Sequence, residues 1–148
     1  MDETSSVIDQ RPAYAGDVAP AGAFATLADD EEAVLVDCRT RAEWEYVGTP
    51  DLAGLGKEAL LLEWLDYPDG KVDAEFADKL VGYGVQRHAP VFFLCRSGVR
   101  SIAAAKAATE AAYESAYNIL EGFEGPTGPA GIRNISGWKV SGLPWKQT

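Results

Sequence analysis

Residues 90–101 read PVFFLCRSGVRS, an apolar run that leads directly into a cysteine and two arginines. The run over 90–94 has the length and composition of a buried strand. The segment that follows, IAAAKAATEAAY, is dense in alanine, the best helix former. A buried strand, a short loop and a helix form the repeating unit of parallel α/β sheets, so this stretch predicts an α/β fold.

The same alternation continues on both sides of this stretch. Thr40 and Glu43 stand three residues apart at the start of RAEWEY, the spacing of a capping box, which predicts a short helix there. The remaining apolar runs predict strands over 33–39 and 115–120 and helices over 21–28 and 72–83. The run over 59–65 fits a strand or the start of a helix, and we favour a strand. The segment 135–145 predicts a short closing helix that stops at Gly142 and Pro144. We therefore expect one α/β domain with helices on both faces of a mostly parallel sheet.

The composition excludes several functions. Thirteen Lys and Arg against 23 Asp and Glu give a net charge of −10, which argues against nucleic-acid binding. No apolar stretch is long enough to cross a membrane, and the acidic start is unlike a signal peptide, so we expect a cytoplasmic protein. Two cysteines, Cys38 and Cys95, are too few for a disulfide framework or a zinc site, and we predict no metal.

The loop after the central strand has the chemistry of a nucleophile site. In a parallel sheet, ligands bind at the carboxyl ends of strands, where Cys95 is expected. Nearby cations and a helix N-terminus both favour the reactive thiolate. The sequence predicts Cys95 as the nucleophile. An anion-binding loop would surround it, in which glycine allows a tight turn and arginine adds charge; its residues are Arg96, Ser97, Gly98, Val99, Arg100 and Ser101.

Four segments together resemble the rhodanese-like sulfurtransferases. They are CRSGVRS (95–101), LVDCRTRAEWEYVG (35–48), YNILEGFEG (117–125) and GWKVSGLPW (137–145). The resemblance implies a three-layer α/β/α fold with a five-stranded sheet. It divides the chain into a flexible lead-in (1–17) and one domain (18–146), with a Gly- and Pro-rich insertion around 125–134. One departure is the region 48–54, which lacks the histidine segment usual in the family.

The resemblance also implies a reaction. A single-domain sulfurtransferase would move a sulfane sulfur from thiosulfate or a persulfide to cyanide or a thiol through a persulfide on Cys95. It would need no cofactor, could meet a sulfur-donor or acceptor protein, and would be a monomer or weak dimer. Two alternatives stay open: a cysteine phosphatase or arsenate reductase on the same fold, and a non-catalytic binding module. Only four residues, RSGV, separate Cys95 from Arg100, one fewer than phosphatases typically have, which favours sulfur.

Other candidate residues receive supporting roles. We expect Asp37 and Arg39 to brace the loop through an ion pair or hydrogen bonds. Cys38, between them, is expected in the core; a resolving role would require it to lie within disulfide reach of Cys95. His88, the single histidine, precedes a strand and is expected in a solvated turn.

Overall fold

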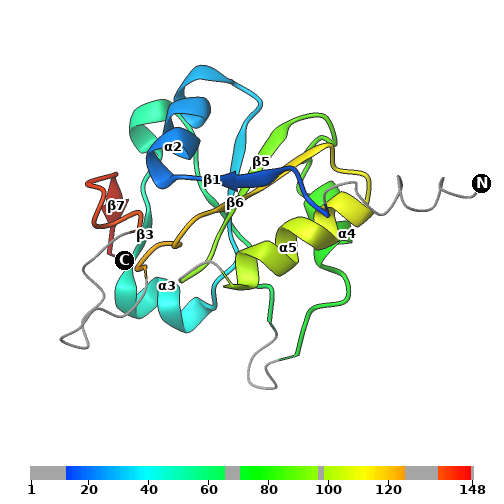
Figure 1. Cartoon of the computed structure of the whole chain (residues 1–148). Helices are drawn as coiled ribbons and strands as arrows, with labels where there is room; N and C mark the ends of the chain where they lie inside the picture. The colour runs from blue at the N-terminus through cyan, green and yellow to red at the C-terminus, as the bar shows by residue number, and fades with distance from the viewer. Residues whose placement is uncertain (1–12, 66–70, 97–98, 126–136, 148) are drawn as a thin grey trace, which may run out of the picture.

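The computed structural model describes residues 13–65, 71–96, 99–125 and 137–147. A five-stranded sheet with the order β1-β6-β5-β2-β4 forms its centre, and neighbouring strands in it run parallel (Figure 1). The strands are β1 (Gly16–Val18), β2 (Val34–Asp37), β4 (Leu60–Leu61), β5 (Pro90–Leu94) and β6 (Ser115–Ile119). The predicted α/β class and five-stranded sheet are confirmed.

Helices cover both faces of the sheet. They are α2 (Pro20–Asp29), α3 (Arg41–Val47), the 3-10 turn η1 (Ala53–Leu55), α4 (Phe76–Gly82) and α5 (Val99–Glu110). One core cluster contains buried residues of α4 and α5 together with Val36 and Phe93, and a second contains α2 residues together with Leu35 and Phe92. Successive strand residues thus point to opposite faces, and β5, buried on both, reads as a continuous apolar run.

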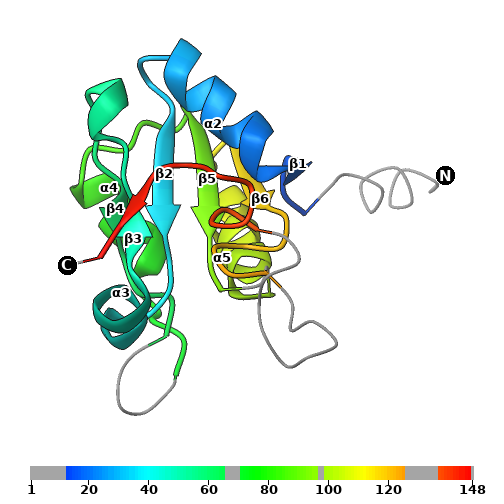
Figure 2. The ribbon, with the colours of Figure 1, turned by 90° about the vertical axis from the view of Figure 1, so that its left-hand side faces the viewer.

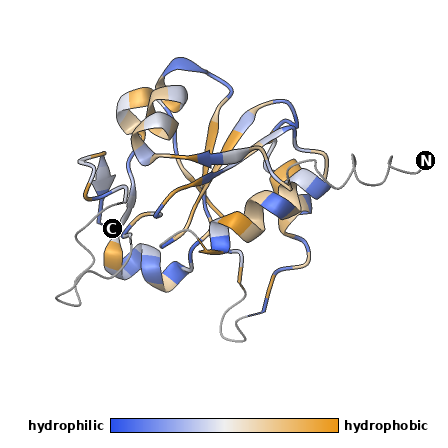
Figure 3. Cartoon of the chain, in the orientation of Figure 1, coloured by the Kyte–Doolittle hydropathy of each residue, from blue (hydrophilic) through white to orange (hydrophobic). Residues whose placement is uncertain are grey.

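Local sequence explains two of the helices. In α5, Ala104, Ala105 and Ala108 are buried, and their small side chains let the helix lie close to the sheet. Helix α3 begins after Thr40, whose side chain forms the predicted capping box with Glu43. None of its residues is buried, and Figure 3 shows it as largely hydrophilic beside the hydrophobic central strands.

The end of the chain folds differently from the prediction. No helix occupies 137–145, the part of the predicted segment 135–145 that the structure describes; turns lead instead to β7 (Trp145–Lys146). Strand β7 pairs antiparallel with β3 (Thr49–Pro50). The reason is local, because Gly137, inside the predicted helix, has a φ of +106°, which a right-handed helix does not allow. Gly142, where the helix is expected to stop, has a φ of +77°.

Several boundaries also move. Gly16 and Asp17, assigned to the lead-in, form β1 with Val18 and pair with Tyr117 and Asn118 of β6. The edge strand is too short and polar to be recognised as one. The predicted helix over 72–83 begins only at Phe76. Residues 126–134 of the predicted insertion lie outside the described residues. No helix in the described ranges is long and apolar enough to span a membrane.

Candidate active site

The predicted nucleophile lies where the carboxyl ends of β2 and β5 meet. Cys95 follows β5 at once, and α5 begins four residues later at Val99. Figure 2 shows this end of the sheet beside α3 and the start of α5. Ser97 and Gly98, predicted to line the anion site, lie outside the described residues.

The Cys95 sulfur contacts a buried polar chain. Its Sγ lies 3.2 Å from Oγ of Ser101, in the first turn of α5. The Ser101 hydroxyl in turn lies 2.5 Å from Oδ1 of Asn118 in β6, to which it donates. The Asn118 amide is fixed in this orientation because its Nδ2 donates to the Asp17 carboxylate at 3.0 Å. With its proton directed at Asn118, Ser101 accepts from the Cys95 thiol, and its hydroxyl can rotate to donate once the thiolate forms.

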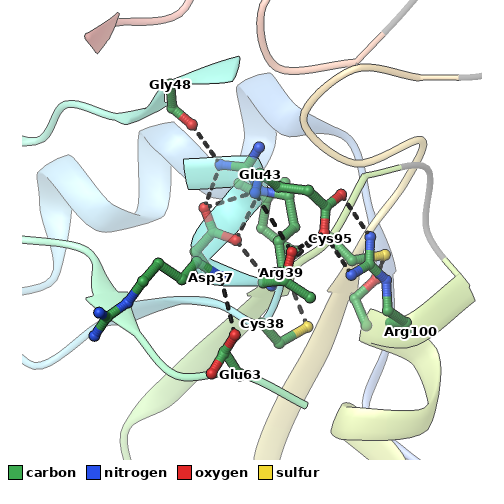
Figure 4. A network of polar contacts seen from close by, with 12 residues as sticks. Asp37, Cys38, Arg39, Glu43, Gly48, Glu63, Cys95 and Arg100 are labelled. Carbon is green, nitrogen blue, oxygen red and sulfur yellow. Dashed lines mark hydrogen bonds and ion pairs between the residues drawn. The ribbon is translucent and has the colours of Figure 1, made fainter. Parts of the chain in front are cut away.

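Arg100 is bound by a carboxylate on another helix. Its Nη1 and Nη2 donate to Oε1 and Oε2 of Glu43 at 2.7 and 2.8 Å, a two-point ion pair (Figure 4). Partial burial raises the pKa of Glu43, but the hydrogen bonds from Arg100 and Thr40 outweigh it and lower the pKa from 4.5 to about 2. The hydrogen bonds that Arg100 donates to the Glu43 carboxylate raise the pKa of Arg100. Glu43 therefore joins the N-terminal turns of α3 and α5.

The turn after β6 binds the backbone of the loop. The Cys95 carbonyl accepts from the Phe123 N–H at 2.7 Å, and the Arg96 carbonyl accepts from the N–H groups of Glu124 and Gly125. The Arg96 side chain itself is exposed. These bonds fix the start of the loop from the side of β6.

Asp37 and Arg39 form a fully buried ion pair at the end of β2. Arg39 donates to Asp37 from Nε at 2.9 Å and from Nη2 at 2.7 Å, and Nη2 also donates to the Gly48 carbonyl at 2.7 Å. Its guanidinium lies 4.2 Å from the centre of the Phe123 ring. The pair thus braces the same turn that binds the Cys95 carbonyl.

The structure brings together some of the predicted residues and separates others. Cys95, Arg100 and Ser101 gather at one end of the sheet, and Val99 begins α5 with an exposed side chain. His88 lies just before the amino end of β5, whereas Cys95 lies at the carboxyl end of the same strand. The His88 Nε2 is 2.9 Å from Oε1 of Glu32.

Two residues of the site were missed. Glu43 was identified only as a helix cap, and its second role depends on a residue 57 positions away. Asn118 had a signal, because an asparagine within an apolar strand needs a hydrogen-bonding partner when it is buried.

The family model described as the STR4 middle domain matches residues 15–148 of the chain. An uncharacterised protein of Rickettsia conorii is 38% identical over 125 residues, which cover 84% of this chain and 91% of that protein. The Rhodanese-like domain-containing protein 4, chloroplastic, of Arabidopsis thaliana is 29% identical over 142 residues, 95% of this chain and 28% of that protein.

Solved structures share the fold. The protein Rv0390 of M. tuberculosis is 49% identical, with a TM-score of 0.84 over 91% of this chain and 99% of that one. The polysulfide-sulfur transferase of Wolinella succinogenes is 19% identical, with a TM-score of 0.63 over 99% of this chain and 91% of that one. The second likeness is one of fold alone.

Proposed function

Because the chain belongs to the STR4 middle-domain family and has a rhodanese-like fold, we propose that it is a sulfurtransferase that carries a sulfane sulfur on Cys95. The observation that carries the proposal is the position of Cys95. It lies at the carboxyl end of a central parallel strand, 3.2 Å from the Ser101 hydroxyl and close to the start of α5. Such a position combines a helix N-terminus with a hydroxyl able to donate to a thiolate.

The reaction proceeds in two displacements at sulfur. The Cys95 thiolate attacks the sulfane sulfur of thiosulfate, the S–S bond of thiosulfate breaks, and its electron pair leaves with sulfite. Cys95 then holds a persulfide. Cyanide or a thiolate then attacks the outer sulfur of the persulfide. The bond between this sulfur and the Cys95 Sγ breaks, and Cys95 is released as a thiolate. Neither leaving group needs a strong acid to protonate it. His88, at the amino end of β5, therefore has no part in this scheme.

The two arginines have different parts in this scheme. Arg96, with its exposed side chain, attracts the anionic donor toward a protein whose net charge is −10. Arg100 is partly neutralised by Glu43, so it holds the first turn of α5 in place more than it attracts the donor. Phosphoryl transfer is the rival reaction, and the four-residue spacing from Cys95 to Arg100 argues against it.

The direct test is incubation of the protein with thiosulfate, followed by intact-mass measurement and a cyanide turnover assay. We expect a one-sulfur adduct on Cys95 and thiocyanate formation, both lost in Cys95→Ser. Turnover that survives in Cys95→Ser would refute the proposal. Activity on an aryl phosphate without a sulfur adduct would indicate a phosphatase, and neither activity would indicate a binding module.

A further inference from the structure

The second cysteine lies directly beside the first. The register of β2 and β5 pairs Val36 with Phe93 and Asp37 with Leu94, which makes Cys38 and Cys95 the next pair along. The Cys38 N–H donates to the Leu94 carbonyl at 2.8 Å, so the ladder continues to this point. Neighbouring strands lie about 4.8 Å apart. Disulfides join Cα atoms about 4.4–6.8 Å apart, so the backbone spacing fits a bridge.

Both sulfur atoms also emerge on the same face of the sheet. Val36 and Cys38 on β2, like Phe93 and Cys95 on β5, belong to the core cluster beneath α4 and α5. The alternate residue Leu94 belongs to the cluster on the other face. Side-chain alternation and register therefore place the two thiols on the same face of the sheet, at neighbouring positions of adjacent strands. Figure 4 labels both cysteines.

We propose that Cys38 is a resolving cysteine, which attacks the persulfide on Cys95 and releases the carried sulfur as hydrosulfide. This inference rests on the proposed sulfurtransferase function and gives the sulfur a further outlet besides an external acceptor. The product is a Cys38–Cys95 disulfide, which a thiol reductant must reduce before the next cycle.

The step balances without an external oxidant. Cys38 Sγ attacks the inner sulfur of the persulfide, the Cys95 Sγ, and forms the new S–S bond. The bond from Cys95 Sγ to the outer sulfur breaks, and its electron pair leaves with that sulfur. The outer sulfur takes up the Cys38 thiol proton and departs as HS⁻. The sulfane sulfur is thereby reduced, and the two cysteine sulfurs are oxidised to a disulfide.

The surroundings of Cys38 suit a second nucleophile better than a first. Its side chain is fully buried, and its Sγ donates to the Leu94 carbonyl at 3.3 Å. Burial raises the pKa of the Cys38 thiol, and the neighbouring Cys95 sulfur raises it further. Cys38 thus stays protonated while the donor reacts, and its proton is available to the departing sulfide, a strong base.

The experiment follows one sulfur through the protein. The reduced wild type is incubated anaerobically with one equivalent of thiosulfate, quenched with an alkylating agent, and analysed for hydrosulfide, intact mass and non-reduced peptides. In the wild type the one-sulfur adduct on Cys95 should form first and then decay, leaving close to one equivalent of hydrosulfide and a peptide crosslinked between Cys38 and Cys95. In Cys38→Ser the one-sulfur adduct on Cys95 should persist, with hydrosulfide release lowered at least tenfold.

A matched control moves the thiol along the same strand. The double variant V36C/C38V retains a cysteine on the same face of β2 but places it opposite Phe93, and it should behave like Cys38→Ser. A second arm uses hydrogen peroxide, which oxidises Cys95 to a sulfenic acid. The Cys38 thiol condenses with this sulfenic acid to form the disulfide and release water. This arm should give the same crosslink without any sulfur donor.

The outcomes separate the two proposals. A persistent adduct in the wild type, with no hydrosulfide and no crosslink in either arm, overturns the role of Cys38 and leaves the sulfurtransferase intact. A peroxide crosslink in the wild type, with no thiosulfate adduct in Cys38→Ser and no hydrosulfide from the wild type, supports the juxtaposition but refutes sulfur release, and the proposed function fails with it. Hydrosulfide release in V36C/C38V at the wild-type level also overturns the inference.

Discussion

The Glu43 side chain both caps helix α3 and forms an ion pair with Arg100. Its carboxylate accepts from the backbone N–H of Thr40 at 3.1 Å, which caps α3, and also accepts both guanidinium N–H groups of Arg100. One acidic side chain thus fixes the starts of two helices beside Cys95. Because Arg100 remains partly buried against it, loss of the charge on Glu43 would leave the arginine without its counter-charge.

The depressed pKa of Glu43 makes stability depend on pH. A folded pKa of about 2, below the ordinary 4.5, contributes stability that is present above pH 4.5 and is lost as the pH falls toward 2. In Glu43→Gln the difference in unfolding free energy between pH 7 and pH 3 should shrink by about 1 to 2 kcal/mol. Urea unfolding at both pH values measures it.

The neighbouring Glu45 provides the control for this prediction. Glu45 lies exposed on the same helix, so Glu45→Gln should retain the wild-type pH dependence. Equal pH profiles for the two variants would show that the Arg100 ion pair contributes nothing to stability.

At the scale of elements, the site depends on a turn that follows β6. Gly122 has a φ of +62°, and a Cβ there would clash with the Cys95 carbonyl oxygen and lie 2.6 Å from the Arg96 carbonyl carbon. The turn can approach the loop backbone because no side chain stands between them. Its N–H groups then reach the Cys95 and Arg96 carbonyls.

Replacement of Gly122 by alanine should therefore displace the loop. We expect Gly122→Ala to lose most sulfur-adduct formation on Cys95 and to lower the free energy of unfolding by about 3 kcal/mol, since left-handed strain and a backbone clash add. Adduct formation by mass and urea unfolding measure the two effects.

Gly142→Ala is the matched control. Gly142 also has a positive φ, +77°, but nothing lies within 4 Å of the added Cβ, so this variant should cost only about 1 to 2 kcal/mol and retain adduct formation. If both variants kept full adduct formation, the position of the loop would not depend on the close contact between Gly122 and the backbone of Cys95 and Arg96.

At the scale of the whole molecule, the C-terminal segment supports the site from the α2 face. Trp138 is fully buried, and its Nε1 donates to the Pro144 carbonyl at 2.8 Å. Trp145 packs edge-on against Phe123, with ring centres 6.2 Å apart. Since Phe123 also lies under Arg39, the ribbon of β3 and β7 is connected to the loop through one aromatic ring.

Removal of residues 144–148 should therefore weaken the whole domain. The deletion leaves the Trp138 Nε1 without its acceptor and removes Trp145 from Phe123, at a cost of about 2 to 4 kcal/mol. We expect the Tm to fall by about 5 to 15 °C in a thermal melt. Of these two residues the structure describes Gln147, whose side chain donates an exposed hydrogen bond to the Tyr46 carbonyl, so removal of 147–148 should shift the Tm little. If the deletions of 144–148 and of 147–148 had the same melting temperature, the pair of strands β3 and β7 would not stabilise the domain.

Local sequence patterns predict the α/β class, the central strand and the position of Cys95 directly after it. These follow from local rules: apolar runs bury, alanine favours helix, and a Thr and Glu three residues apart cap a helix. The same rules failed at the chain end, where the described residues 137–147 form turns and β7 in place of the expected short helix, with Gly137 at a positive φ.

Only the tertiary structure decided which distant residues meet around Cys95. The pairing of β2 with β5 places Cys38 across from it, the packing of α3 beside α5 joins Glu43 to Arg100, and β6 brings Asn118 to Ser101. Sequence patterns report whether a side chain is buried, because burial follows from local periodicity. They do not report strand order or register, which arise when the whole core packs. Ser101 is close to Cys95 in the sequence, whereas register and packing bring Cys38 and the Phe123 N–H to it.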